Sequence, residues 1–239
     1  MKRMKVARTA VILAGGRGLR LRSVVNDRPK VLADVRGRPF LAYLLDQAAS
    51  AGIRRAILCV GYRAGDVQVA FGKTFAGMDL LYSREIELLG TGGALRLALP
   101  LLEDEVFLGM NGDSFCDVNL EEVWHSHHER QARATIVVTE REDVRRYGQV
   151  TVADEGVVVA FREKKSTVGS GWVNAGIYVL AKTVIEQIPP HTVVSLERDV
   201  LPGCIGNGLF GFKSGGSFLD IGTPESYRKA AELFSKGKE

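Results

Sequence analysis

Near its start the chain reads ARTAVILAGGRGLRL over residues 7–21. Residues 7–14 are mostly apolar and include β-branched side chains, which predicts a buried strand that ends in a glycine-rich turn. In an open α/β sheet, ligands bind beyond the carboxyl ends of the strands. Glycines in such a turn let backbone N–H groups approach a phosphate closely. The stretch therefore predicts a phosphate-binding loop.

Neither of the two best-known phosphate loops fits this turn. The dinucleotide fingerprint would need glycine at Leu21, and no Gly-Lys-Ser/Thr follows as in a P-loop. Instead the loop carries Arg17 and Arg20, and Pro29-Lys30 comes soon after it. A lysine is a point charge suited to a transferring phosphoryl group. We therefore expect phosphate chemistry from a loop of another kind.

Short apolar runs alternate with helical patterns through the first 110 residues. Repeated strand–helix alternation predicts a parallel sheet with helices on both faces. After the first strand we expect strands at residues 56–60, 79–82 and 105–110, and helices at residues 40–51, 64–71 and 91–101.

The second half is richer in strands. We expect a helix at 119–130, strands at 134–140, 149–153, 157–162, 172–180, 209–212 and 217–219, and helices at 181–187, 195–201 and 223–234. Asp154-Glu155-Gly156 is a hairpin signal, and Thr223-Pro224 is a good helix start. The pattern predicts one α/β domain over residues 1–239, with a mostly parallel sheet and an antiparallel elaboration in its second half.

Composition excludes several classes of protein. With 46% hydrophobic and 25% charged residues, the chain is an ordinary globular protein. The net charge of +4 comes from 32 basic and 28 acidic residues that are interspersed, which argues against a nucleic-acid partner. The three cysteines are far apart, so a disulfide framework and a zinc site are both disfavoured. No apolar run is long enough for a membrane span or a signal peptide, so we expect a cytoplasmic protein without a membrane partner.

Three histidines, His125, His127 and His128, fall on the helix expected at 119–130. They have no acidic ligands at a metal-binding spacing. We interpret them as part of a solvated helix face.

The glycine loop and Pro29-Lys30 together resemble the signature of the sugar-1-phosphate nucleotidylyltransferases. Further matches to that family follow in order along almost the whole chain, at residues 89–94, 111–113, 147–148, 163–164, 174–176 and 218–224. The resemblance implies a Rossmann-like three-layer sandwich, the nucleotide-diphospho-sugar transferase type. It also implies a nucleotide-binding half at about residues 7–118 and a sugar-phosphate-binding half at about 119–239.

Residues 21–25, 36–41 and 87–93 are similar to one subgroup, the D-glycero-α-D-manno-heptose 1-phosphate guanylyltransferases. That similarity implies GTP and a heptose 1-phosphate as substrates and GDP-heptose as product. A mannose 1-phosphate guanylyltransferase and a uridylyl- or thymidylyltransferase are alternatives within the family. A catalytically idle regulator that binds sugar nucleotides is an alternative of another class. Dimers are common among short members of the family, which leaves a homodimer open.

The family reaction is an in-line attack by a sugar-phosphate oxygen on the α-phosphorus of a nucleoside triphosphate, with loss of pyrophosphate. The nucleophile is already anionic, so catalysis rests on positioning and electrostatics. By resemblance, the catalytic residues are Arg17, Lys30, Asp113 and Asp220, and the two aspartates hold Mg²⁺, which prefers oxygen ligands. We expect both aspartates on the same sheet edge.

The resemblance also implies two sets of binding residues. The nucleotide would be held by Leu13, Ala14, Gly15, Gly16, Gly18, Gly90, Thr91 and Asn111. The sugar phosphate would be held by Gly148, Glu163, Lys164 and Asn174. Glu87 is our candidate for base choice, because a carboxylate can accept from both N1–H and N2–H₂ of guanine. The alternative is that Glu87 is a solvated loop acid.

Overall fold

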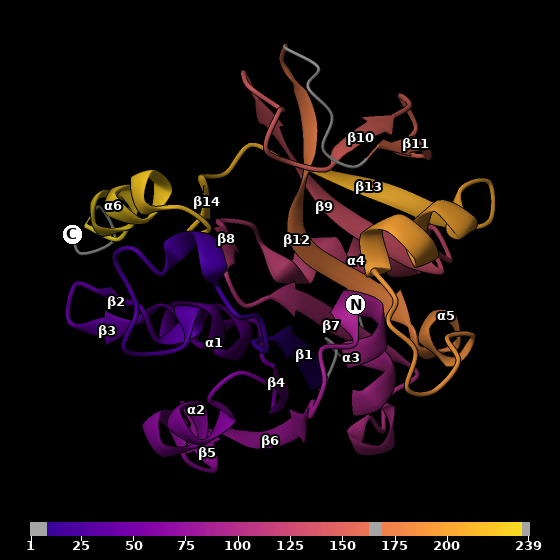
Figure 1. Cartoon of the computed structure of the whole chain (residues 1–239). Coiled ribbons are helices and arrows are strands. Elements are labelled where there is room, and N and C mark those ends of the chain that lie inside the picture. The colour runs from indigo at the N-terminus through magenta and orange to yellow at the C-terminus, as the bar shows by residue number, and fades with distance from the viewer. Residues whose placement is uncertain (1–8, 163–168, 236–239) are drawn as a thin grey trace.

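The computed structural model describes residues 9–162 and 169–235, so the predicted sugar-phosphate residues Glu163 and Lys164 lie outside the described residues. Four parallel strands run in the order β7-β1-β4-β6 through the first half. Their bounds are β1 (Thr9–Leu13), β4 (Arg55–Val60), β6 (Met78–Arg84) and β7 (Val106–Asn111). Each matches a predicted strand to within about two residues, and Figure 1 shows them side by side.

Helices cover both faces of this parallel sheet. Within β1, Ala10 and Ile12 belong to one buried apolar cluster and Val11 to another, because alternate residues of a strand point to opposite faces. The first cluster includes side chains of α1 (Phe40–Ser50), α2 (Ala64–Phe71), α4 (Leu120–Glu129) and α6 (Pro224–Leu233). The second includes side chains of α3 (Gly90–Ala98) and α5 (Lys182–Glu186). The predicted three-layer α/β fold is confirmed.

A long strand, β12 (Gly171–Ala181), joins the two halves of the molecule. It pairs antiparallel with β7, through Ile177 opposite Met110, and also with β9 (Ala134–Arg141). The predicted hairpin is formed by β10 (Gln149–Val152) and β11 (Val158–Arg162). One strand departs from the antiparallel elaboration, because β13 (Leu209–Ser214) runs parallel to β9. Over the described residues this main sheet has ten strands.

Several short elements were not predicted from the sequence patterns. They are β2 (Asp34–Val35), β3 (Arg38–Pro39), β5 (Thr74–Phe75), β8 (Ser114–Cys116) and the short helical turns η1 (Leu19–Leu21) and η2 (Lys30–Leu32). The helical turn η3 (Leu99–Leu101) completes the helix predicted at 91–101. Further along the chain, the predicted helix at 195–201 consists of a π-helical turn, η4 (Leu196–Val200), followed by η5 (Leu201–Cys204).

The strand that carries Asp220 lies outside the main sheet. Asp220 ends β14 (Phe218–Asp220), which pairs antiparallel with β8 in a separate two-stranded sheet. Our expectation that Asp113 and Asp220 share one sheet edge was therefore wrong in its geometry. The two aspartates still meet, because Asp220 lies opposite Ser114 and the N–H of Ile221 donates to the carbonyl of Asp113 at 3.0 Å.

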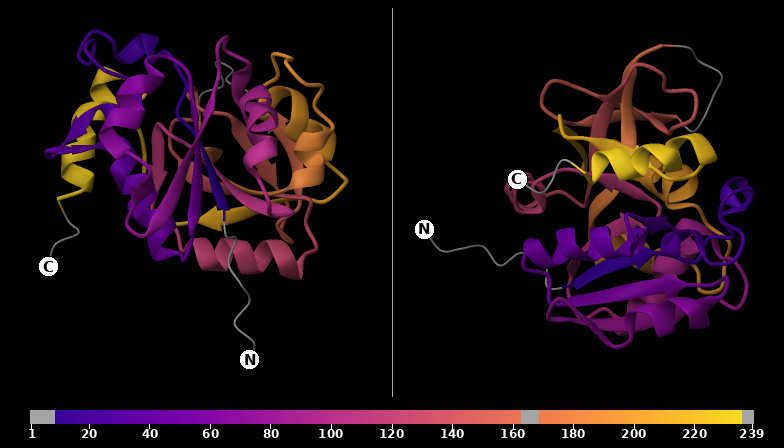
Figure 2. Two further views of the ribbon diagram at one scale, coloured as in Figure 1. Left: turned by 90° about the horizontal axis from the view of Figure 1, so that it is seen from below. Right: turned by 90° about the vertical axis from the view of Figure 1, so that its left-hand side faces the viewer.

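The last helix, α6, lies beside α1, as both views of Figure 2 show. Just beyond its end, the ring of Phe234 stacks on Tyr43 with 3.9 Å between ring centroids, and it meets Phe115 edge-on at 5.0 Å. Such aromatic pairs contribute about 0.5–1.5 kcal/mol each beyond the area they bury. The C-terminal segment is thereby held against α1 and β8.

Helix α4 corrects our interpretation of the histidines. His125 is exposed and pairs with Glu129, but His127 is only 2% exposed. The Nδ1 atom of His127 lies 2.9 Å from Oγ1 of Thr135 on β9. The helical spacing turns His127 toward the sheet, so this residue belongs to the core and not to a solvated face.

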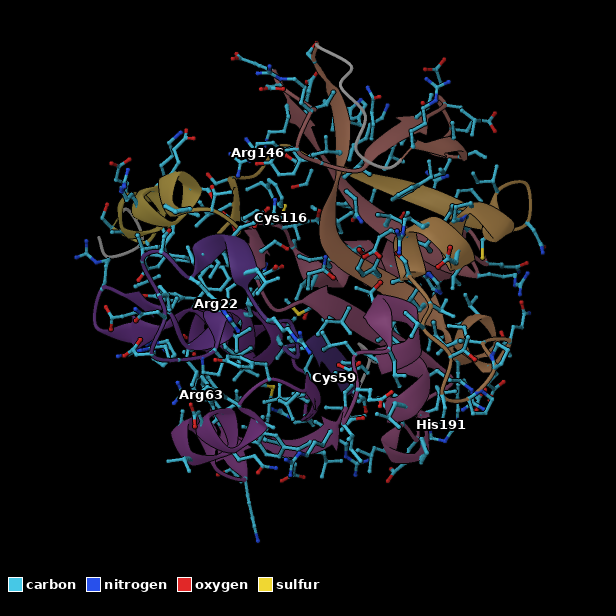
Figure 3. All side chains as sticks on the ribbon, in the orientation of Figure 1. Arg22, Cys59, Arg63, Cys116, Arg146 and His191 are labelled. Atoms are coloured by element: carbon cyan, nitrogen blue, oxygen red, sulfur yellow. The ribbon has the colours of Figure 1, made fainter. Side chains whose placement is uncertain are left out.

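In the described part of the chain no helix is long and apolar enough to cross a membrane. All three cysteines are free and buried, and Figure 3 shows Cys59 and Cys116 well apart. The predicted absence of a disulfide framework agrees with this arrangement.

Candidate active site

A cavity of about 380 Å³ opens where β7, β12 and β14 meet the N-terminus of α3. Seven of the residues predicted from the sequence line its wall: Gly90, Thr91, Asn111, Asp113, Gly148, Asn174 and Asp220. They come from five separate stretches of the chain. The fold therefore brings the predicted nucleotide, sugar and metal residues to one cavity.

Lys30 connects the two predicted metal ligands. Its Nζ atom donates to Oδ2 of Asp113 at 2.7 Å and lies 3.8 Å from Oδ1 of Asp220. The lysine side chain is only 9% exposed, whereas that of Asp113 is 44% exposed. A cation is thus held beneath two carboxylates that both line the cavity.

Burial raises the pKa of Asp220, and the nearby charge of Asp113 raises it further. Lys30, the N–H of Gly222 and Arg20 act in the opposite direction on the same pKa. The N–H of Gly222 donates to Oδ1 of Asp220 at 2.5 Å, which fixes that oxygen. Two carboxylates this close repel each other, so the site favours an added positive charge.

The glycine loop is anchored at its base to the neighbouring strands. The carbonyl of Leu13 accepts from Gly112, the N–H of Ala14 donates to the carbonyl of Cys59, and the carbonyl of Gly15 accepts from Tyr62. Toward its tip, Gly16 and Arg17 are exposed. The predicted residues Leu13, Ala14, Gly15, Gly16, Arg17 and Gly18 thus form one turn, next to the walls of the cavity and not in them.

A residue that we did not predict, Glu85, lies directly against this loop. A Cβ atom on Gly15 would lie 2.5 Å from Oε2 of Glu85, so any side chain there would displace the carboxylate. Glu85 is 7% exposed, and its Oε1 accepts from the N–H of Leu89 at 3.0 Å. Burial raises the pKa of Glu85, and the bond from Leu89 partly offsets this effect.

Glu87, our sequence-based candidate for base choice, is exposed on the same loop. The sequence held a signal for Glu85, because this residue directly follows β6, at the carboxyl end of a parallel strand. Glu87 lies two residues further from that end. Of the two carboxylates, only that of Glu85 is buried against the glycine loop.

The cavity wall also contains residues outside the set predicted from the sequence. Arg20, Arg146, Ser195, Glu197 and Arg198 all line it. Arg146 donates to Oγ1 of Thr223 at 2.8 Å, and Figure 3 shows it beside the segment that leads into β14. Arginine side chains here add positive charge near Asp220, where an anionic substrate would need it.

Arg20 lies in the glycine loop and Arg146 directly precedes the match at residues 147–148, but the other three side chains belong to segments without a strong motif. Ser195, Glu197 and Arg198 follow a polar loop, and no spacing rule connects them with β12. From the sequence alone, a glutamate in a short helix is expected to lie on the solvent-exposed face of that helix. Only the tertiary contacts distinguish Glu197 from an ordinary surface acid.

Comparison with known proteins shows which family the chain resembles. A family model described as nucleotidyl transferase matches residues 9–237. The D-glycero-alpha-D-manno-heptose 1-phosphate guanylyltransferase of Aneurinibacillus thermoaerophilus is 36% identical over 222 residues, which cover 92% of this chain and 96% of that one. The mannose-1-phosphate guanylyltransferase of Mycobacterium tuberculosis is 34% identical over 94% of this chain but only 64% of its own length.

Solved structures agree with these matches. The crystal structure of HddC from Yersinia pseudotuberculosis superposes with a TM-score of 0.84 at 35% identity, covering 95% of this chain and 99% of that one. The same protein in complex with GMP-PN gives a TM-score of 0.83. A putative glucose-1-phosphate thymidylyltransferase from Bacillus anthracis, 20% identical, shares the fold with a TM-score of 0.87, covering 97% of this chain and 96% of its own.

Proposed function

Since the chain belongs to the nucleotidyl transferase family, we propose that it transfers a guanylyl group from GTP to D-glycero-α-D-manno-heptose 1-phosphate. The products are GDP-heptose and pyrophosphate. The observation that carries this proposal is the cavity in which Lys30 connects Asp113 and Asp220 beside the glycine loop. Relatives named for this activity in two bacteria, each matched over 96% of its length, support the choice of substrates.

Lys30 and the glycine loop would act on the triphosphate. The attacking oxygen of the sugar phosphate is already anionic, so no side chain has to remove a proton from it. The difficulty is to bring two anions together and to stabilise the charge that develops on the α-phosphate. Lys30 would neutralise that charge, while Arg17 and the loop N–H groups would hold the departing pyrophosphate.

The donor set of the cavity fits Mg²⁺. Asp113 and Asp220 offer carboxylate oxygens near one another, and burial together with mutual repulsion disfavours two bare negative charges there. Among the described residues no group of three or more His, Cys, Asp or Glu side chains could hold a metal. This suits Mg²⁺, which is usually bound by one or two carboxylates together with substrate phosphates. When bound, the ion would supply positive charge to the phosphate oxygens.

Glu85 would select the base. Its carboxylate lies against the glycine loop and retains acceptor capacity besides the bond from Leu89. Guanine presents the N1–H and N2–H₂ donors that a carboxylate can accept together, whereas uracil and thymine lack this pair. The similarity to a structure in complex with GMP-PN supports the same choice.

A mannose 1-phosphate guanylyltransferase is the second candidate function. It is favoured by the 34% identity to a relative of that name, close to the 36% of the heptose enzyme. The two reactions differ only in the sugar, so one assay separates them.

The experiment is pyrophosphate release by the purified protein with Mg²⁺, across the common nucleoside triphosphates, with heptose 1-phosphate and mannose 1-phosphate tested separately. We expect release with GTP and the heptose phosphate, and its loss when EDTA removes the metal. Release with mannose phosphate alone would select the second candidate. No release with any pair would refute the proposed activity.

We further propose a cytoplasmic location, which is supported by three free and buried cysteines, since thiols stay reduced there. A homodimer stays a prediction, which light scattering of the purified protein would test.

A further inference from the structure

Glu197 is a carboxylate in the cavity wall that has no part in the mechanism above. We propose that Glu197 binds hydroxyl groups of the sugar ring and thereby selects the sugar substrate. This inference rests on the proposed function, because it assigns the part of the same cavity that would hold the sugar ring.

Three hydroxyl groups hold the carboxylate of Glu197. Oγ1 of Thr91 donates to Oε2 at 2.6 Å, and Oγ of Ser195 donates to the same oxygen at 3.0 Å. The hydroxyl of Tyr178, a fully buried residue on β12, donates to Oε1 at 3.1 Å. The partners come from three different elements, so the carboxylate is held in place by tertiary structure.

The direction of each of these hydrogen bonds follows from a second contact. The N–H of Leu196 donates to Oγ1 of Thr91 at 2.8 Å, and Nδ2 of Asn174 donates to the hydroxyl of Tyr178 at 2.7 Å. The N–H of Arg198 donates to Oγ of Ser195 at 3.2 Å. Because each hydroxyl already accepts from a group that can only donate, its single proton is free to point at Glu197.

This network leaves acceptor capacity on Glu197. An ionised carboxylate has about four acceptor positions, and the three hydroxyls occupy three of them. Two of the hydroxyls share Oε2, so Oε1 has room for a further donor. Since Glu197 lines the cavity, a ligand in the cavity can supply that donor.

The chemistry of the site points to a neutral hydroxyl donor. The hydrogen-bond partners described above for Glu197 are hydroxyls, whereas the other two carboxylates of the cavity, Asp113 and Asp220, lie next to Lys30. An ionised carboxylate repels a phosphate of like charge. It accepts strongly from an alcohol, because hydrogen bonds to a charged acceptor are stronger than neutral ones. The sugar ring is the part of the substrate that offers such donors.

Glu197 is also tied to the nucleotide side. The N–H of Val194 donates to the carbonyl of Leu89 at 2.8 Å, and the N–H of Gly92 donates to the carbonyl of Val194 at 2.9 Å. These bonds attach the segment before η4 to the N-terminus of α3. The position of Glu197 relative to the nucleotide loop is therefore set before substrate binds, which lowers the entropy cost of binding.

The test begins with Glu197→Gln, which keeps the shape of the side chain and removes its charge. We expect the KM for the sugar 1-phosphate to rise about 10–100-fold, as for the loss of a charged hydrogen bond. The KM for GTP should stay within about twofold, because the amide oxygen of the glutamine can still accept from Thr91 and the glycine loop is untouched. Glu186→Gln, an exposed glutamate on α5, is the matched control and should leave both values unchanged.

Deoxy analogues of the sugar 1-phosphate make the test specific. For the wild type, at least one analogue that lacks a single ring hydroxyl should lose about tenfold or more in kcat/KM. In Glu197→Gln the same analogue should lose much less, because the partner of that hydroxyl is already gone. A merely structural role for Glu197 would penalise every analogue by the same factor in both proteins.

Each outcome bears on the proposal. An unchanged KM for the sugar in Glu197→Gln, or equal analogue losses in both proteins, would overturn it while the wild-type activity still supports the proposed function. A wild type that releases no pyrophosphate with any sugar 1-phosphate would overturn both. Should Glu197→Gln fail to fold by circular dichroism, Glu197→Asp, which keeps the charge but withdraws it by one methylene, should show the same rise in sugar KM.

Discussion

Lys30 is the side chain on which the two predicted metal ligands converge. Replacing it by methionine keeps most of its volume but removes the charge next to Asp113 and Asp220. We expect kcat/KM to fall by about 100-fold or more, as when one preorganised electrostatic donor is lost from an active site. Steady-state pyrophosphate release with GTP measures this, and Lys73→Met, at an exposed lysine, is the control. A loss of less than threefold would remove Lys30 from the mechanism.

Glu85 and Glu87 form a matched pair for testing base selection. Glu85 is buried against the glycine loop, and Glu87 is exposed two residues later. We expect Glu85→Gln to lower kcat/KM for GTP by about tenfold or more, because an amide cannot accept from both guanine donors. Glu87→Gln should leave the value unchanged. The opposite result, with the loss in Glu87→Gln, would restore the interpretation drawn from sequence.

At the scale of elements, the contact between the start of α3 and the segment before η4 shapes the cavity. Gly90 has a φ of 75° there, and a Cβ atom on it would lie 2.5 Å from the carbonyl oxygen of Val194. We expect Gly90→Ala to cost about 1–3 kcal/mol of unfolding free energy through backbone strain. The clash should also displace the segment that carries Glu197, so the KM for the sugar phosphate should rise. Urea unfolding and steady-state kinetics measure the two effects.

Gly65→Ala is the control for this substitution. Gly65 lies in the first turn of α2, and nothing lies within 4 Å of a Cβ atom built on it. Alanine there should leave the unfolding free energy unchanged or raise it slightly, because alanine favours a helix over glycine. If both variants lost equal stability, contact with Val194 would not explain the cost at position 90.

The stability of the whole molecule should depend on pH through His127. Burial lowers the pKa of this imidazole, the neighbouring His128 acts in the same direction, and together they bring it from 6.5 to about 4. Between these values the unfolded chain binds a proton that the native state does not, so the unfolding free energy rises with pH across that window. We expect this residue alone to make the protein about 2 kcal/mol less stable at pH 5 than at pH 7.

Urea unfolding at both pH values would measure this effect. In His127→Gln the difference between pH 5 and pH 7 should shrink by that amount, whatever the variant does to the absolute stability. The control is His191→Gln, at an exposed loop position, which should keep the wild-type difference. A variant of His127 with the full wild-type difference would show that the buried imidazole does not carry it.

The sequence by itself determined the order and type of the main elements. Strands buried on both faces appear as continuous apolar runs, and helices show their own periodicity, so local patterns were sufficient to predict β1, β4, β7 and the helices that cover them. The glycine loop and Lys30 were also predicted from the sequence. The glycines directly follow a predicted strand, and Lys30 follows them at a spacing typical of the family. Seven of the residues predicted from the sequence lie in the wall of one cavity.

Only the tertiary structure decided which side chains lie beside the glycine loop and in the cavity wall. Glu85 was distinguished from Glu87 by burial against Gly15, and Glu197 from a surface acid by hydroxyls on α3 and β12. The same holds for Asp220, which reaches Asp113 through the separate β8–β14 sheet. Such contacts join residues far apart in the chain, and their energies depend on distance in space. A local pattern carries no information about that distance.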